Sequence, residues 1–169
     1  LEKSYTDWSR DMLERMEQRP GGPDFIAQAQ AEDATAKLEE TRAKALAAAY
    51  TQALEAARAA GFSDCSPGRF LLPGELAGSP VLTFAPLPPQ DSAPRKSLWR
   101  EMERRFDAYK SQVVKPFFRD HFSRIDRQVV LVDALGAIHA GPRAMEDLRR
   151  TMADILSAFR PGTNAFLSQ

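Results

Sequence analysis

The chain has little of what marks secreted, membrane-spanning or nucleic-acid-binding proteins. Its single cysteine, Cys65, cannot form an internal disulfide, which is typical of a reducing compartment. Lysine plus arginine and aspartate plus glutamate both total 23, so no net charge attracts nucleic acid or an anionic membrane. No apolar run approaches the roughly 20 residues that span a bilayer, and charges stand where a signal peptide has its apolar core. We therefore expect a soluble, cytoplasmic protein with no membrane span and no nucleic-acid partner.

The sequence motifs of several catalytic classes are also absent. The chain contains no phosphate-binding loop of the form G-x-x-x-x-G-K-S/T, no dinucleotide fingerprint G-x-G-x-x-G and no nucleophile elbow G-x-S-x-G. It also has no C-x-x-C or H-E-x-x-H motif, and His121 and His139 have no companions at the spacing of metal ligands. No catalytic or metal-binding residue can therefore be identified by motif within the 169 residues.

What the chain does contain is helical periodicity. With 43% hydrophobic and 27% charged residues, it has enough apolar side chains for the core of one ordinary domain. Apolar residues at helical spacing predict helices over 4–18, 96–122 and 143–159. Residues 24–60 are rich in the strongest helix formers, so we expect one long helix there that ends at Gly61.

Prolines limit this helical pattern in two places. Pro116 removes one helical hydrogen bond and disfavours the helical conformation at Lys115, so the helix over 96–122 should kink or end there. Residues 61–95 hold most of the 12 prolines. We expect an ordered loop that packs its larger apolar side chains against the helices: Phe70, Leu72, Leu82 and Phe84. A flexible interdomain linker is the alternative, although linkers seldom carry so many large apolar side chains.

Residues 128–133 are expected to form a strand of a parallel sheet. Four consecutive apolar residues, Val129 to Val132, predict a strand that helices bury on both faces. Its neighbouring strands must come from the proline-rich loop or from sequence outside the 169 residues. We therefore predict a predominantly helical fragment of an α/β protein that carries a large helical insertion.

Asp133 follows that strand and is the candidate binding residue. In open α/β sheets, ligands gather at the carboxyl ends of the strands. An acid there can bind a metal ion in a P-loop enzyme, support the site through a hydrogen bond, or cap the next turn. The pattern D-x-x-G at 133–136 is also found near the γ-phosphate in GTPases, but two fixed positions in four recur often by chance. Position alone favours a cap or a supporting role over direct nucleotide contact.

Three stretches of unusual sequence resemble the YcjX family of bacterial P-loop NTPases: GRFLLPGELAGSPVLTFAPL (68–87), VKPFFRDHF (114–122) and DRQVVLVDAL (126–135). The resemblance implies a Ras-like parallel sheet with a helical insertion, in a GTPase-like cytoplasmic protein linked to stress responses. It places the phosphate-binding loop before this chain and the base-recognition motif after it. The longer protein would therefore bind GTP or GDP, or ATP, with Mg²⁺, whereas this fragment alone would bind none of them. The resemblance also makes the D-x-x-G pattern a coincidence and leaves Asp133 in a supporting role.

Two hypotheses of different classes follow. In the first, residues 1–95 are a helical insertion with an ordered Pro/Gly-rich loop, and residues 96–169 supply a kinked helix, a buried strand and a helix to a P-loop NTPase core. The longer protein would then hydrolyse GTP or ATP, a reaction for which this fragment alone lacks the parts. In the second, the chain is a helical module that binds a protein partner of unknown identity without catalysis. The doubly buried strand favours the first hypothesis, because an all-helical module has no use for it.

Overall fold

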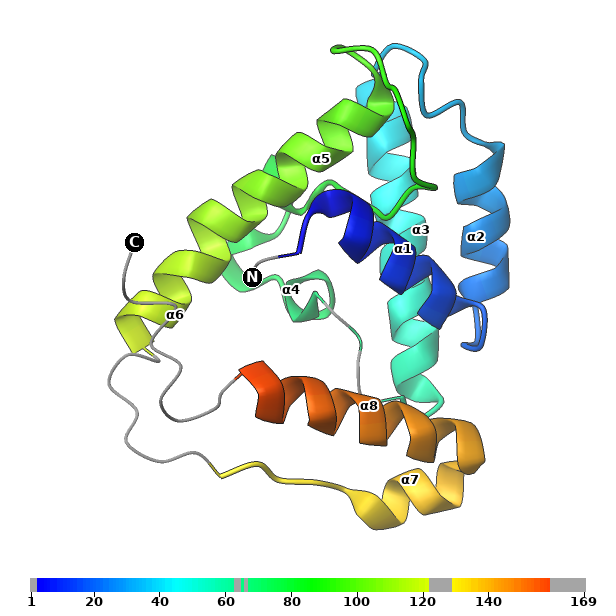
Figure 1. Cartoon of the computed structure of the whole chain (residues 1–169), viewed down its shortest axis with the longest axis vertical. Helices are drawn as coiled ribbons and strands as arrows, with labels where there is room; N and C mark the ends of the chain where they lie inside the picture. The colour runs from blue at the N-terminus through cyan, green and yellow to red at the C-terminus, as the bar shows by residue number, and fades with distance from the viewer. Residues whose placement is uncertain (1–2, 63–64, 66, 122–128, 159–169) are drawn as a thin grey trace.

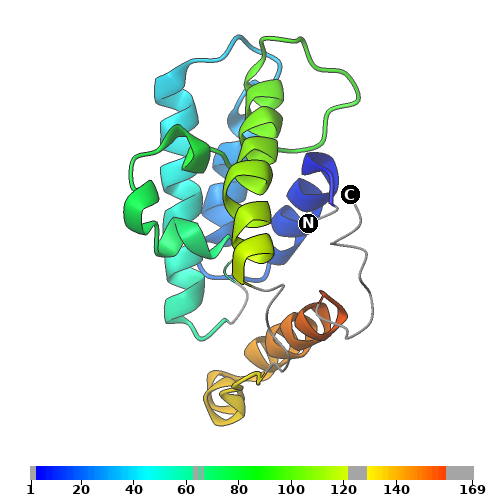
Figure 2. The same ribbon diagram turned by 90° about the vertical axis from the view of Figure 1, so that its left-hand side faces the viewer.

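The part of the chain that the computed structural model describes, residues 3–62, 65, 67–121 and 129–158, is predominantly helical. Its longer helices are α1 (Tyr5–Met16), α2 (Gly22–Ala31), α3 (Glu40–Ala59), α5 (Leu98–Tyr109) and α8 (Pro142–Ala158). The shorter ones are α4 (Gly68–Leu71), α6 (Lys115–His121) and α7 (Ala134–Ala140). We call α1 to α5, with the loops between them, the helical body; α7 and α8 form a hairpin at one end of it (Figures 1 and 2). None of the described helices has the length and apolarity needed to cross a membrane.

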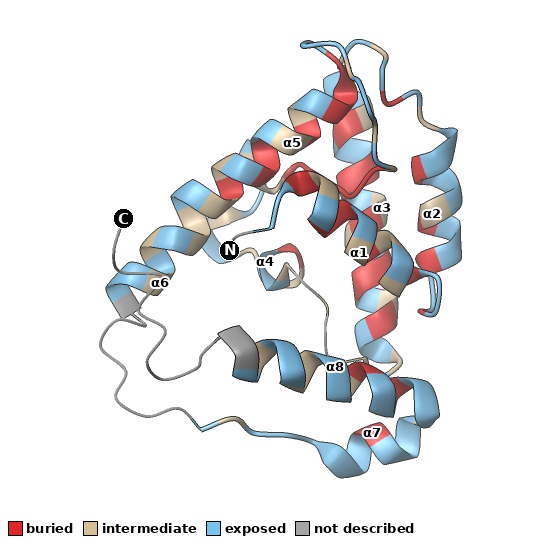
Figure 3. Cartoon of the chain, viewed as in Figure 1, coloured by how far each residue is buried: buried red, intermediate tan, exposed pale blue. Residues whose placement is uncertain are grey.

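Aromatic side chains from three helices meet in the core of the helical body. Trp8 of α1 stacks on Phe106 of α5 with ring centroids 4.8 Å apart, and Tyr5 meets Trp99 edge to face at 5.2 Å. Tyr50 of α3 stands edge-on to Trp8 at 6.2 Å. Such pairs contribute about 0.5–1.5 kcal/mol each beyond the burial of the rings. Buried residues line the facing sides of α1, α3 and α5 in Figure 3, so these helices share one core.

The proline-rich loop is ordered over residues 67–95, as the sequence predicts. Phe70 and Phe84 are buried in the core of the body, and Leu82 is half-buried. The prediction is wrong for Leu72, which is 67% exposed. Phe70 belongs to the single turn α4, whereas Leu72 follows that turn as its C-cap, with the non-helical angles φ −132° and ψ 70°. The backbone thus leaves the helix at Leu72, whose side chain points to solvent.

Part of this loop, residues 84–87, runs through the core as a buried strap. The Tyr5 hydroxyl donates a hydrogen bond to the Ala85 carbonyl at 2.8 Å, and the Ser9 hydroxyl donates to the Leu87 carbonyl. Prolines within and after the strap have no N–H group, so the segment cannot pair as a strand on that edge. Its buried carbonyls still require donors, and two hydroxyl groups of α1 supply them.

The single long helix predicted over 24–60 is wrong, because the chain leaves the helical conformation between α2 and α3. The Asp33 carboxylate accepts a hydrogen bond from the Thr35 N–H at 3.0 Å, which forms a local turn. Next to it, the Ala34 carbonyl accepts from the Trp99 N–H at 2.9 Å. The first turn of α5 thus supplies backbone donors to the break. Tertiary hydrogen bonds have overridden a strong local helix propensity.

The helix over 96–122, which was predicted to kink or end near Pro116, continues through it, with a π-helical turn just before the proline. Residues Lys110–Val114 are wound more widely between α5 and α6. A wider turn accommodates the missing N–H and the ring of Pro116 without ending the helix. Lys115 keeps helical angles, φ −59° and ψ −47°, so the prediction that it leaves the helical region is wrong. The segments α5 and α6 consequently follow one another as a single rod (Figure 1).

The strand predicted over 128–133 is not formed, and residue 128 lies outside the described residues. Residues 129–133 have no regular structure, and Val129 and Leu131 are 82% and 93% exposed. A strand needs a neighbour for its backbone hydrogen bonds, and the described residues form only one isolated β-bridge, between Lys37 and Ser97. The predominantly helical character is therefore confirmed, while the described part of the chain contains no sheet.

The predicted C-terminal helix is confirmed as α8. Pro142 occupies its first position, where a missing N–H does no harm, and Gly141 before it has a left-handed φ of 101°. The sequence did not predict α7, a helix of seven residues that contains a glycine. The last position of the helix predicted over 143–159 lies outside the described residues.

Candidate functional site

Asp133 is the N-terminal cap of α7. Its Oδ1 accepts a hydrogen bond from the Gly136 N–H at 2.8 Å and so satisfies one of the unpaired donors in the first helical turn. A Cβ atom on Gly136 would lie 2.3 Å from Asp133 Oδ2, so a glycine is needed for the carboxylate to sit there. Capping geometry thus explains the D-x-x-G pattern. Asp133 is exposed to solvent, and its support of a nucleotide site stays a prediction.

The other candidate residues do not gather around Asp133. His139 lies in the last turn of α7 and is exposed, and Cys65 is half-buried near the Phe62 carbonyl. Within the described ranges, no three His, Cys, Asp or Glu side chains come together as a metal ion requires. The described residues therefore hold no preformed cluster of three such side chains, whereas Mg²⁺ beside a nucleotide usually needs only one or two carboxylates, with water and phosphate oxygens completing its shell.

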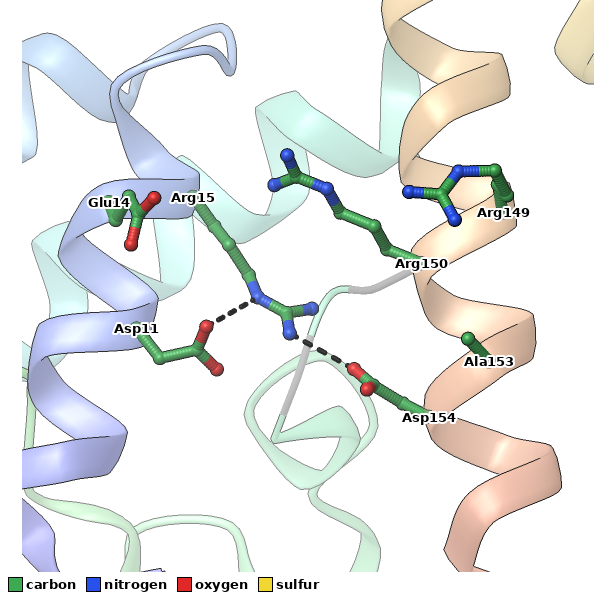
Figure 4. A pocket seen from close by; sticks show the side chains of 7 residues that line it. All are labelled: Asp11, Glu14, Arg15, Arg149, Arg150, Ala153 and Asp154. Carbon is green, nitrogen blue, oxygen red and sulfur yellow. Dashed lines mark hydrogen bonds and ion pairs between the residues drawn. The ribbon is translucent and has the colours of Figure 1, made fainter.

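A charged pocket lies between α1 and α8 (Figure 4). It has a volume of about 250 Å³ and is lined by side chains of both helices: Asp11, Glu14, Arg15, Arg149, Arg150, Ala153 and Asp154. Arg15 bridges the two helices, because its Nε donates to Asp11 Oδ1 at 3.1 Å and its Nη2 donates to Asp154 Oδ2 at 3.0 Å. Three arginines share the pocket with three carboxylates. The pocket therefore joins two helices and presents no surface of a single charge to a ligand.

The arginines of this pocket pair with carboxylates that line it or lie beside it. Burial alone would raise the pKa of Asp11, but hydrogen bonds from Lys3 and Arg15 hold that pKa below its ordinary value. Arg149 and Arg150 pair with Glu146 on α8, and their hydrogen bonds lower the pKa of Glu146 to about 2. Each arginine that lines the pocket thus already binds a carboxylate. An incoming anion would have to displace one of these groups.

A buried ion pair makes a second connection to α8. Arg19 lies just after α1, and its Nη2 donates to Oδ1 of Asp147. The two side chains are only 2% and 9% exposed. The Arg19 guanidinium also lies over the Phe62 ring, 5.5 Å from its centroid. This pair is the most deeply buried of the charge contacts described between the helical body and the hairpin.

Sequence reasoning missed the four residues that make these two connections. Arg15 and Arg19 stand 128 or more positions away from Asp147 and Asp154. Singly, each looks like an ordinary solvated charge. One signal was present: the two aspartates are seven positions apart, so they lie along one face of α8, although Arg19 lies beyond the end of α1 and shares no helical face with Arg15. Opposite charges attract each other, but the sequence does not say that these residues meet.

The whole chain, residues 1–169, matches the sequence profile of the YcjX-like family, DUF463. It is 34% identical over 172 residues to the "Ras-like GTPase YcjX" of Escherichia coli (strain K12), an alignment that covers 96% of this chain and 37% of that protein. It is 33% identical over 179 residues to the protein of the same name from Shewanella oneidensis, which covers 99% of this chain and 37% of the relative. The chain thus spans a little over a third of the length of these curated relatives. Because the profile matches along its full length and both relatives exceed 30% identity, the chain belongs to the YcjX-like family.

Proposed function

We propose that this chain is a segment of a longer nucleotide-binding protein of the Ras-like GTPase type. The observation that carries the proposal is the match along the whole chain to two proteins named "Ras-like GTPase YcjX". The longer protein would bind GTP and GDP, or ATP, with Mg²⁺ and would hydrolyse the triphosphate. A cytoplasmic location and a role in stress responses belong to the same proposal.

Within that protein, this chain would supply structure around the nucleotide site. Phosphoryl transfer needs backbone amides and a lysine around the β- and γ-phosphates. The 169 residues contain no loop of that sequence, and the described residues hold no cluster of three or more possible metal ligands. We therefore propose that phosphates and metal bind to other parts of the longer protein. Asp133 would act there by fixing the start of α7 through its hydrogen bond to Gly136.

Residues 128–133 would form a strand of the longer protein's parallel sheet. Val129, Leu131 and Val132 are 82%, 93% and 42% exposed and Val130 is half-buried, so the described residues leave much of this apolar run uncovered. A sheet with helices on both faces would cover it. The direct continuation from this segment into a capped helix is typical of a strand that delivers its last residue to the ligand edge.

The packing bears on where the insertion ends. The sequence places the boundary between insertion and core between residues 95 and 96. Trp99 and Phe106 of α5 lie in the aromatic core of the helical body, which supports a later boundary. We propose that the insertion extends through α6 and that the core segment begins with residues 129–133.

The second candidate function is a helical module that binds a protein without catalysis. Leu135 and Ile138 of α7 are 79% and 59% exposed, which favours some protein contact on this helix. Under the first proposal, the rest of the longer protein contacts these side chains. Under the second, a separate protein partner contacts them.

Nucleotide titration of the longer protein decides between them. We expect calorimetry to show micromolar binding of GTP in the presence of Mg²⁺, and a phosphate-release assay to show turnover. The isolated chain of 169 residues should bind neither GTP nor ATP, since it has no phosphate-binding loop. A longer protein that binds neither nucleotide would refute the proposal and leave the interaction module. Micromolar binding by the isolated chain would show that its phosphate site lies within these residues.

A further inference from the structure

The apolar side chains of α8 take no part in the core of the helical body. That core consists of residues from α1 to α5 and the loops between them, and the half-buried apolar residues packed against it end at Val114. Among the described residues, no apolar side chain of α8 belongs to this core or packs against it. An amphipathic helix of a soluble protein turns its apolar side to the core that it stabilises. The apolar side of α8 therefore belongs to another core.

The side of α8 that meets the helical body carries charge. Asp147 pairs with Arg19, which lies just after α1. Two turns further along α8, Asp154 pairs with Arg15 of α1 across the charged pocket of Figure 4. The two aspartates are seven positions apart, so they lie along one side of the helix. We call this the charged side of α8.

The opposite side of α8 is apolar. Successive residues of an α-helix are about 100° apart around its axis, so two positions along the chain lead nearly to the other side. Met145 stands two positions before Asp147, and Met152 stands two positions before Asp154. Leu156 stands two positions after Asp154. Met145 and Leu156 are 37% and 59% exposed, and Met152 is half-buried. The helix thus turns its charges to the helical body and these larger apolar side chains away from it.

Further apolar side chains are exposed on α7 and on the segment before it. Leu135 and Ile138, one turn apart on α7, are 79% and 59% exposed, and Leu131 is 93% exposed. Elsewhere in the described part of the chain, the exposed large apolar side chains are Leu72 and Phe117. Figures 1 and 2 place α7 and residues 129–133 beyond α8 as seen from the helical body. Apolar groups concentrated in this way mark a surface that another part of a protein covers.

We infer that the apolar side of α8, together with Leu135 and Ile138 of α7, packs on a face of the longer protein's parallel sheet, beside the strand proposed for residues 128–133. This chain covers 37% of each curated relative, so most of the longer protein lies outside it. The inference rests on the proposed function, because that proposal supplies the sheet. On this arrangement α8 lies between two parts of the longer protein, with its charged side on the helical body and its apolar side on the sheet.

The backbone before α7 indicates that the cover is a sheet. No backbone hydrogen bond of residues 129–132 is found within the described part of the chain. Neighbouring strands supply partners to a whole extended segment, whereas a helix packed on it covers its side chains alone. The hairpin follows this segment directly, and a helix that follows a strand of a parallel sheet packs back on that sheet. One sheet therefore accounts for the backbone groups and for the apolar side chains.

Thiol reactivity of the longer protein, purified alone and without nucleotide, tests the covering. Leu135→Cys and Leu156→Cys are made after Cys65 and any other cysteine are replaced, and circular dichroism should match that of the wild type. Both leucines are more than half exposed in this chain, so their protection must come from outside it. Relative to the urea-unfolded form, each cysteine should react with a maleimide at least about 30-fold more slowly. Arg143→Cys is the matched control on α8, because Arg143 is exposed and lies four positions before Asp147, on the charged side; its reaction should slow less than about threefold. Equal rates at all three positions overturn the inference.

Two further measurements identify what covers the cysteines. Amide hydrogen exchange over 129–132 should be slowed at least about 100-fold relative to an unstructured peptide, because strand pairing occupies the N–H groups. Fast exchange beside protected cysteines would show a cover other than a sheet and overturn the inference. Sedimentation should show that the protected protein is a monomer. Protection that disappears on dilution would assign the surface to a second copy and overturn the inference as well.

Nucleotide titration separates this inference from the proposed function. Binding of GTP or ATP by a protein whose cysteines react freely overturns the packing of α8 on the sheet and leaves the proposed function standing. Protected cysteines and amides in a protein that binds neither nucleotide overturn the proposed function and leave the packing standing.

Discussion

Tyr5→Phe removes one oxygen atom from the core of the helical body. The Tyr5 hydroxyl donates to the Ala85 carbonyl at 2.8 Å, and both residues are fully buried or nearly so. Burial raises the pKa of Tyr5, so the hydroxyl remains protonated and a donor at any pH used for the experiment. The phenylalanine ring would keep the edge-to-face contact with Trp99 at 5.2 Å. The substitution therefore isolates the hydrogen bond from the packing.

The expected loss is the cost of leaving the Ala85 carbonyl buried without its donor. That cost is about 1–3 kcal/mol of unfolding free energy, or roughly 2–12 °C in melting temperature for a chain of this size. Urea unfolding of the 169-residue chain followed by tryptophan fluorescence measures it, because Trp8 and Trp99 are the only two tryptophans and both lie in this core. Tyr109→Phe is the matched control, since no hydrogen bond of the Tyr109 hydroxyl is found among the described residues. If the two variants unfold alike, the strap is held by packing alone and the reasoning fails.

Three further outcomes are expected. Gly136→Ala should weaken the start of α7 by about 0.5–2 kcal/mol, because the new Cβ displaces the Asp133 carboxylate; amide hydrogen exchange over 134–140 measures it, and unchanged protection would contradict the cap. Burial alone would raise the pKa of Glu101, but hydrogen bonds from Arg104 and Arg105 hold it below its ordinary 4.5. The ionised Glu101 therefore adds to the unfolding free energy above pH 4.5, and this stabilisation is lost as the pH falls towards the lowered pKa. Urea titrations at successive pH values measure this pH dependence, and Glu101→Gln should remove it. Asp133→Asn in the longer protein should lower the melting temperature slightly and keep GTP turnover within about tenfold; collapsed turnover with unchanged melting would place Asp133 among the catalytic residues.

Local patterns predicted the elements whose partners lie nearby in the sequence or whose apolar faces are long. The helix over 4–18 and the helix starting at Pro142 follow from caps and periodicity, and the ordered loop follows from Phe70 and Phe84. The break between α2 and α3 could not be predicted, because its backbone donor belongs to Trp99, more than 60 positions away. Helix propensity describes a segment by itself, whereas here a hydrogen bond from a distant segment determines where the helix breaks.

The candidate site shows the same division. That Asp133 accepts a hydrogen bond from the turn after it was predictable, because the cap and Gly136 lie within four residues. The strand before Asp133 was predicted because its apolar residues were expected to be buried. Several of them are exposed, and a strand forms only beside neighbouring strands that the described residues do not supply. The pair of Arg19 and Asp147 joins two segments 128 positions apart, a contact that no local pattern specifies.

The buried strap also has a consequence for the order in which the body can form during synthesis. Tyr5 and Trp8 are made before the groups that they contact, because the Ala85 carbonyl and the Phe106 ring follow about 80 to 100 residues later. At translation rates of roughly 5–20 residues per second, α1 waits about 5–20 s for α5. During that interval the tyrosine, tryptophan and methionine side chains of α1 lack the residues against which they pack, so they are exposed and can bind chaperones. A ribosome that stalls between α3 and α5 would therefore release a chain whose first helix is exposed, so completion of α5 is the step that commits the body to its fold.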